Sequence, residues 1–110
     1  MFELSLTVQP CGKIQEKCKG RYRLYISYSI SKCLRDKYKI ARGSEVIFML
    51  NNKIIKAKIS CGPPLKKGFD IYSGQLNIWL INNKLCNYEK GQPKKINFTV
   101  VSTNPLNLKY

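Results

Sequence analysis

Histidine is absent from this chain of 110 residues, and acidic side chains are scarce. There are 6 Asp and Glu against 20 Lys and Arg, which gives a formal net charge of +14 at pH 7. The lack of histidine excludes a mixed Cys/His zinc site and removes the commonest general base of catalysis. A generic solvated surface mixes both signs of charge, so this imbalance predicts a polyanionic partner. Nucleic acid is favoured over an anionic membrane surface.

Features typical of membrane proteins, secreted proteins and enzymes are missing as well. No apolar run approaches the length needed to cross a bilayer. The N-terminus MFELSLTVQP lacks the basic start and long apolar block of a secretory signal, so we expect a cytoplasmic protein, in the host cytoplasm if its source is viral. The six carboxylates show no paired spacing, and no glycine-rich phosphate loop is present. We therefore expect no catalytic residues and no cofactor.

Five cysteines are present, with no C-x-x-C pair among them. An all-cysteine metal site would need four scattered ligands, so we expect no metal site. In a reducing cytoplasm we expect the thiols to be largely reduced. A local disulfide between Cys11 and Cys18, which flank one basic loop, is the alternative. Cys33 lies on an apolar helix face and is expected to pack in the core.

The clearest structural pattern runs from Ser29 to Ser60. Apolar residues at helical spacing predict a helix over Ser29–Tyr38, with Ser29 as its N-cap; they are Ile30, Cys33, Leu34 and Tyr38. Gly43 permits a turn with positive φ. Two alternating segments around Asn51-Asn52 predict an antiparallel hairpin, Glu45–Leu50 with Lys53–Ser60.

Shorter patterns suggest the remaining elements. Alternating apolar residues predict strands over Phe2–Gln9, Arg21–Ser29, Phe69–Tyr72 and Lys95–Ser102. The basic segment Gly12–Gly20 is expected to be a mobile, exposed loop, and Pro63-Pro64 marks another loop. Gln75–Leu85 suits either a helix or a buried strand, with helix favoured and Trp79 in the core. No element is assigned to Thr103–Tyr110.

A helix, a glycine and an alternating strand occur twice in the chain. SISKCLRDKYKIARG overlies NIWLINNKLCNYEKG without gaps, so that Gly43 meets Gly91 and the strand around Phe48 corresponds to the strand around Phe98. Internal duplication and coincidence both explain this pattern. No linker or composition break divides residues 1–110, so we expect one strand-rich α+β domain of about six strands with one or two short helices.

The run from Ser29 to Ser60 resembles the AbrB/MazE type of swapped-hairpin DNA-binding module. Ile30-Ser31 stands where that family has Ile-Pro, and Leu34-Arg35 matches its Leu-Arg. Tyr38-Lys39-Ile40 replaces its Leu-Gly-Ile element, and Gly43-Ser44-Glu45-Val46 replaces its Gly-Asp-x-Val turn. The match covers about a third of the chain. The resemblance implies a cradle-loop barrel, which a duplicated chain would complete alone, and it leaves a monomer and a homodimer both open.

These observations favour a non-enzymatic nucleic-acid-binding protein, with DNA preferred over RNA and modest sequence specificity, because lysine far outnumbers arginine. Residues on two predicted strands form the expected binding surface: Arg21, Arg23, Tyr25, Lys53, Lys56 and Lys58. Tyrosine beside arginine also suits a single-stranded DNA or RNA ligand. Two further alternatives are a nuclease and a viral or accessory protein that binds another protein. An amino-acid composition typical of an AT-rich genome suggests the second of these.

Overall fold

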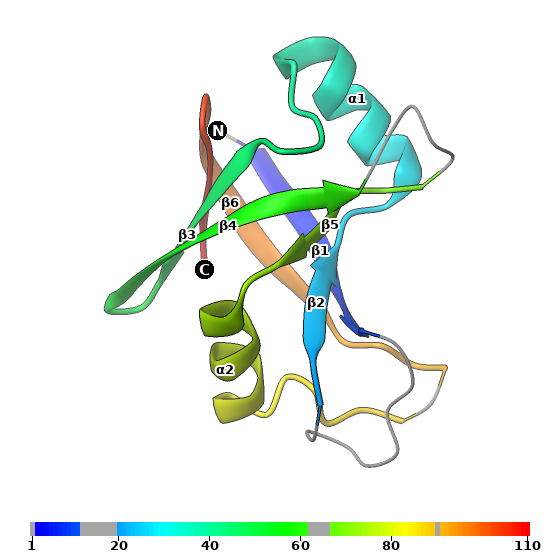
Figure 1. Cartoon of the computed structure of the whole chain (residues 1–110), viewed down its shortest axis with the longest axis vertical. Helices are drawn as coiled ribbons and strands as arrows, with labels where there is room; N and C mark the ends of the chain where they lie inside the picture. The colour runs from blue at the N-terminus through cyan, green and yellow to red at the C-terminus, as the bar shows by residue number, and fades with distance from the viewer. Residues whose placement is uncertain (1, 12–19, 62–66, 90) are drawn as a thin grey trace.

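Seven strands and two helices form the part of the chain that the computed structural model describes, residues 2–11, 20–61, 67–89 and 91–110. In chain order they are β1 (Phe2–Pro10), β2 (Tyr22–Tyr25), α1 (Tyr28–Tyr38), β3 (Glu45–Leu50), β4 (Lys53–Cys61), β5 (Asp70–Tyr72), α2 (Gly74–Asn82), β6 (Lys95–Thr103) and β7 (Leu106–Lys109). The predicted strand-rich α+β domain is confirmed. Figure 1 shows α1 and α2 at opposite ends of the strands.

The strands close into a barrel in the order β1-β2-β5-β4-β3-β7-β6. All neighbouring pairs are antiparallel except β3 and β7, which run parallel. Because side chains alternate along a strand, each strand sends every second residue into the barrel. Phe48 and Phe98 are fully buried there, with ring centroids 5.5 Å apart in an edge-to-face arrangement. A single chain therefore encloses its own core.

The central hairpin is confirmed. β3 pairs with β4 in the register Glu45↔Lys58 through Leu50↔Lys53. Asn51 takes a left-handed conformation at φ 50°, and Gly43 supports the preceding turn at φ 90°. The buried face of β4 consists of Ile55, Ala57 and Ile59, as predicted. Its other face is therefore free to meet a ligand.

Strand pairing in the barrel repeats with a two-fold pattern. The first half runs β1, β2, α1, β3 and the second β4, β5, α2, β6. Exchanging the halves maps the Val8↔Leu24 pair onto Ile59↔Ile71, as these registers show. It likewise maps Leu4↔Phe98 onto Ile55↔Phe48. Leu24 and Ile71 also pair with each other, so this β2–β5 contact lies where the two halves meet.

The sequence overlay is correct at one point and displaced at another. Gly43 and Gly91 both have positive φ, at 90° and 83°, and each precedes an equivalent strand. However, the ungapped overlay sets Tyr28, where α1 begins, against Leu76, although α2 begins at Gly74. β7 has no counterpart in the first half and lies between β3 and β6. The repeat is thus a property of strand pairing more than of residue spacing.

α1 contacts the barrel through a narrower face than the sequence predicts. It begins at Tyr28, so Ser29 lies inside the helix; Ser27 occupies the N-cap and makes no side-chain cap hydrogen bond. The predicted burial of Cys33 is also wrong, since Cys33 is exposed. The side chains that α1 buries are Ser31 and Leu34. Only one edge of the apolar face of α1 therefore packs against the barrel.

Ser31 accounts for this orientation of α1. Its hydroxyl lies 2.8 Å from the Ser27 carbonyl and 3.1 Å from the Ile26 carbonyl, and it accepts a hydrogen bond from the Phe69 N–H at 2.9 Å. A fully buried hydroxyl needs such partners. The contact fastens α1 to the segment that enters β5.

α2 is helical, as favoured from the sequence. Its N-cap Ser73 accepts a hydrogen bond from the Leu76 N–H at 3.0 Å. Leu76, Trp79 and Leu80 are buried at i, i+3 and i+4, which confirms Trp79 in the core. The Trp79 ring also contacts the Tyr110 ring at 5.1 Å.

Three further expectations need correction. The second strand ends at Tyr25 instead of Ser29, because the chain turns there into α1. The tail forms β7, which pairs with both β3 and β6. Cys86 is disulfide-bonded and Cys11 is a free thiol, so the thiols are not all reduced and Cys11 does not pair with Cys18. The loop prediction for residues 12–19, and Pro63-Pro64, lie outside the described residues.

Candidate nucleic-acid interface

The outward face of β4 carries the predicted lysines. Lys56 and Lys58 are exposed and alternate with the buried residues of the same strand. Two residues of a strand span about 7 Å, which approximates the step between successive phosphates along one DNA strand. Lys53 is exposed at the start of β4, beside the hairpin turn, but it shares the strand face of Leu50 and Ile55, opposite to that of Lys56 and Lys58. Lys56 and Lys58 are therefore available to the same anionic ligand.

β2 and β4 are not neighbours, because β5 lies between them. Lys58 pairs with Tyr72, and continuing the Leu24↔Ile71 register by one residue sets Tyr72 level with Arg23. A row across the barrel wall thus runs Arg23, Tyr72, Lys58. Neighbouring strands lie about 4.8 Å apart, so the ends of this row are separated by roughly 10 Å. We call the outward face of β2, β5 and β4 the basic face.

Arg23 is held by contacts within the protein. Its Nε lies 2.9 Å from Asp70 Oδ1, an ion pair without hydrogen-bond geometry. Its two terminal nitrogens donate to the Pro10 carbonyl at 3.1 Å and to Gln9 Oε1 at 3.2 Å. The side chain is 28% exposed. Arg23 therefore joins β1, β2 and β5, and each of its two terminal nitrogens already donates one hydrogen bond within the protein.

Tyr25 has a comparable internal contact. Its hydroxyl accepts a hydrogen bond from the Gly68 N–H at 3.0 Å. A Cβ on Gly68 would lie 2.8 Å from Cζ and the hydroxyl oxygen of Tyr25 and 1.8 Å from the Ile26 carbonyl oxygen, so only glycine fits at this position. Tyr25 consequently shapes the entry to β5.

Tyr72 is a residue of this face that sequence reasoning missed. It is half-buried, and it is the two-fold equivalent of Tyr25. The signal was the alternation of the Phe69–Tyr72 segment, in which Phe69 and Ile71 are buried and Tyr72 points outward. Arg21 is exposed immediately before β2. The structure thus brings Arg23, Tyr72 and Lys58 into one row, while Lys53 lies toward the hairpin end of β4.

One exposed carboxylate borders the basic face. Glu45 pairs with Lys58 across β3 and β4, whereas the cross-strand partner of Lys56 is the uncharged Ile47. Opposite charges that face each other across a pair of strands attract, so part of the Lys58 charge is compensated. Lys56 consequently presents the less compensated charge.

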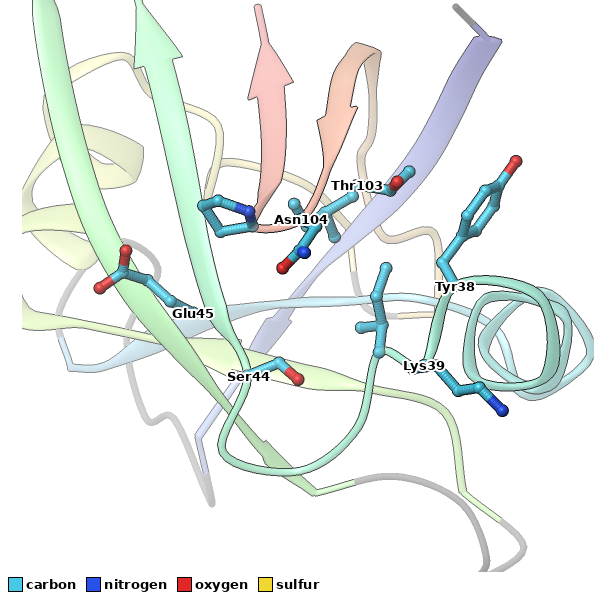
Figure 2. A pocket seen from close by; sticks show the side chains of 9 residues that line it. Tyr38, Lys39, Ser44, Glu45, Thr103 and Asn104 are labelled. Atoms are coloured by element: carbon cyan, nitrogen blue, oxygen red, sulfur yellow. The ribbon is translucent and has the colours of Figure 1, made fainter.

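A separate pocket of about 400 Å³ opens where the α1–β3 connection meets the β6–β7 turn. Figure 2 shows the Glu45 carboxylate and the Lys39 ammonium on opposite sides of it. Ser44 Oγ accepts a hydrogen bond from the Ala41 N–H at 3.0 Å and so stabilises the turn.

Metal-ligand clusters and membrane-spanning helices are both missing from the described part of the chain. Within residues 2–11, 20–61, 67–89 and 91–110, no group of three or more His, Cys, Asp or Glu side chains is placed to hold a metal ion. Over the same ranges, no helix is long and apolar enough to span a membrane.

Comparison with known proteins adds no assignment: no family model, no curated protein and no solved structure matches this chain. The function is therefore argued from the chemistry of the surface, because a barrel fold alone supports many activities.

Proposed function

We propose that this protein is a non-enzymatic nucleic-acid-binding protein, which holds the phosphate backbone of DNA against the basic face. The net charge of +14 supports a polyanionic ligand. Lysine contacts to phosphate carry no base identity, so sequence specificity is modest.

One observation carries the proposal. Lys56 and Lys58 occupy the same places in the second half of the barrel as Ser5 and Thr7 do in the first, according to the matched registers of β4 and β1. The strand pairing is maintained with small neutral side chains at those places in β1. The fold therefore does not require charge there, and a ligand is the simplest reason for lysine in β4.

The residues of the basic face have different roles in this proposal. Lys56 and Lys58 meet phosphates, and exposed Arg21 extends the contact beyond β2. Lys53 shares the strand face of Leu50 and Ile55 and lies outside the basic face. Arg23 and Tyr25 are positioning residues, since their polar groups already bind Gln9, Asp70 and Gly68. Tyr72 is the aromatic side chain placed to contact sugar or a base between Arg23 and Lys58.

Salt-dependent binding to a duplex of mixed sequence tests the proposal. Removal of one phosphate contact flattens the slope of log affinity against log salt by roughly 0.9, so Lys56→Gln/Lys58→Gln should flatten it by up to about 1.8. The matched control is Lys84→Gln/Lys95→Gln, which removes two exposed lysines elsewhere and leaves the net charge equal to that of the test variant. Equal slopes for the two variants would contradict a defined basic face.

Three ligands in the same assay separate the remaining alternatives. Duplex DNA should bind at least as tightly as single-stranded DNA or RNA of equal length. Single-stranded DNA could instead bind more tightly than the duplex. If Tyr72→Ala then weakens the single-stranded complex by about 1–3 kcal/mol and removes the preference, base stacking on Tyr72 is the better explanation. If no nucleic acid shows a salt-dependent affinity, the proposal fails and a protein partner becomes the better explanation.

A further inference from the structure

A second surface lies between α1 and the start of β1, and it is mainly apolar, unlike the basic face. It is a groove of about 500 Å³ with a largely apolar lining that includes Phe2, Leu4, Ile30, Cys33 and Leu34. Phe2 is 37% exposed and Ile30 is 36% exposed. We call this surface the α1 groove. Its exposed apolar side chains lie together, which marks an interaction site more often than scattered ones do.

A second hollow adjoins the α1 groove. The rings of Phe2 and Tyr38 stack with centroids 5.9 Å apart and planes 13° apart. The same two residues line an adjoining hollow of about 230 Å³ with Val101, which is 43% exposed. The two hollows share Phe2 and Tyr38, and together they offer apolar side chains on which the apolar face of an amphipathic helix can pack.

In the second half of the barrel, the equivalent helix α2 buries its apolar face. α2 buries Leu76, Trp79 and Leu80, and Tyr110 covers Trp79. Counted from the two N-caps, Ser27 and Ser73, the residues Ile30 and Cys33 correspond to Leu76 and Trp79. The chain thus buries these helix positions in α2 and leaves them exposed in α1.

The charge around the α1 groove selects the kind of occupant. The Lys37 ammonium lies at the groove over the Tyr38 ring, 5.4 Å from its centroid. Lys32 and Lys39 are exposed on and directly after the same helix, but neither lines the α1 groove. Glu3 lines the groove, and Asp36 is paired with Arg35. A second copy of this chain would bring another net charge of +14, so self-association is disfavoured electrostatically.

We propose that the α1 groove binds an acidic amphipathic segment of another protein, whose apolar side chains fill the groove while a carboxylate meets Lys37 and the net charge of +14 attracts the segment as a whole. Burial of the exposed Ile30 and Phe2 supplies affinity, and the charges set the orientation. This binding does not depend on the basic face or on nucleic acid.

Fluorescence anisotropy with a labelled synthetic helical peptide tests the proposal. The peptide carries Asp and Glu, with Leu and Phe at i, i+3 and i+4; a sister peptide has alanine at the apolar positions and the same charge. Wild-type protein should bind the first about ten-fold or more tightly than the second, because burial of apolar side chains separates them. Ile30→Gln/Cys33→Ser should reduce this preference to near unity.

Ile78→Gln is the matched control, since Ile78 is exposed on α2, outside the α1 groove. It should leave peptide affinity unchanged, and both variants should keep wild-type affinity for DNA and wild-type thermal unfolding. Equal affinity for the two peptides would overturn the proposal, because the binding would then be charge attraction alone. Sedimentation that shows a wild-type dimer dissolved by Ile30→Gln/Cys33→Ser would overturn it in favour of a second copy.

Discussion

β1 and β4 occupy equivalent places in the two halves of the barrel, and each buries alternate residues against the same core. Their outward faces differ: Ser5 and Thr7 in β1 correspond to Lys56 and Lys58 in β4. The alternation that builds the barrel is therefore satisfied by either kind of side chain. This comparison separates what the fold needs from what a ligand needs.

α1 and α2 differ in the opposite sense. α2 is capped by Ser73 and buries three large side chains, whereas α1 is held through the buried Ser31 and leaves Ile30 and Cys33 exposed. The half that leaves its helix positions exposed has neutral side chains on the outward face of its first strand, and the half that buries them has lysines there.

The largest expected effect tests whether the two halves contribute equally to the core. Phe48→Ala and Phe98→Ala should each lower the free energy of unfolding by about 3–5 kcal/mol, because both rings are fully buried. Their edge-to-face contact should add a coupling of about 0.5–1.5 kcal/mol in a double-mutant cycle. Chemical denaturation measures both quantities. A near-neutral result at either position would break the equivalence.

The anchoring of the two helices should differ by residue. Ser31→Ala should cost about 1–3 kcal/mol, because it leaves the buried Phe69 N–H without its acceptor. Ser73→Ala should cost about 1 kcal/mol by removing a helix cap. Ser27→Ala is the control and should cost little, since the Ser27 side chain makes no cap hydrogen bond. Thermal unfolding that ranks Ser27 above Ser31 would contradict this description of α1.

The basic face should respond unequally along β4. Lys56→Gln should flatten the salt slope for duplex DNA by about 0.9, and Lys58→Gln by less, because Glu45 already compensates part of the Lys58 charge. Glu45→Gln should strengthen binding. Anisotropy titrations at several salt concentrations measure all three variants. Weaker binding by Glu45→Gln would show that the phosphate path does not pass Lys58.

The smallest expected effect concerns alkaline pH. Burial raises the pKa of Tyr88 above its ordinary value of about 10, and the nearby Tyr22 raises it further. A folded-state pKa above the unfolded one gives stability that is present below about pH 10 and is lost as pH rises through the folded value. The difference in phenolate absorbance between the wild type and Tyr88→Phe, followed as a function of pH, should show that Tyr88 ionises above the ordinary tyrosine pKa. Ionisation at or below that value would be inconsistent with its burial.

Much of the framework could be predicted from sequence, because alternation reports directly on which strand face is buried. The hairpin and the inward set of β4 both follow from it. The orientation of α1 could not be predicted, since it depends on a hydrogen bond from Phe69 to Ser31, 38 residues apart in sequence. The same holds for β7, whose short polar sequence becomes a strand because β3 and β6 provide partners on both sides.

The candidate interface was predicted in part for a related reason. The outward placement of Lys56 and Lys58 follows from local alternation. The role of Arg23 does not, because Gln9 and Asp70 come from two other strands that flank β2. Tyr72 enters the row only once β5 is known to separate β2 from β4. Strand order is a long-range property that periodicity alone does not fix.

Relocation of charge between the halves tests the central claim most directly. Lys56→Ser/Lys58→Thr combined with Ser5→Lys/Thr7→Lys moves two lysines from β4 to the equivalent places on β1 and keeps the net charge at +14. If the basic face binds DNA, this variant should show the weakened affinity and the flattened salt slope of Lys56→Gln/Lys58→Gln, by up to about 1.8. Wild-type affinity and slope would contradict a binding surface that depends on the lysines of β4.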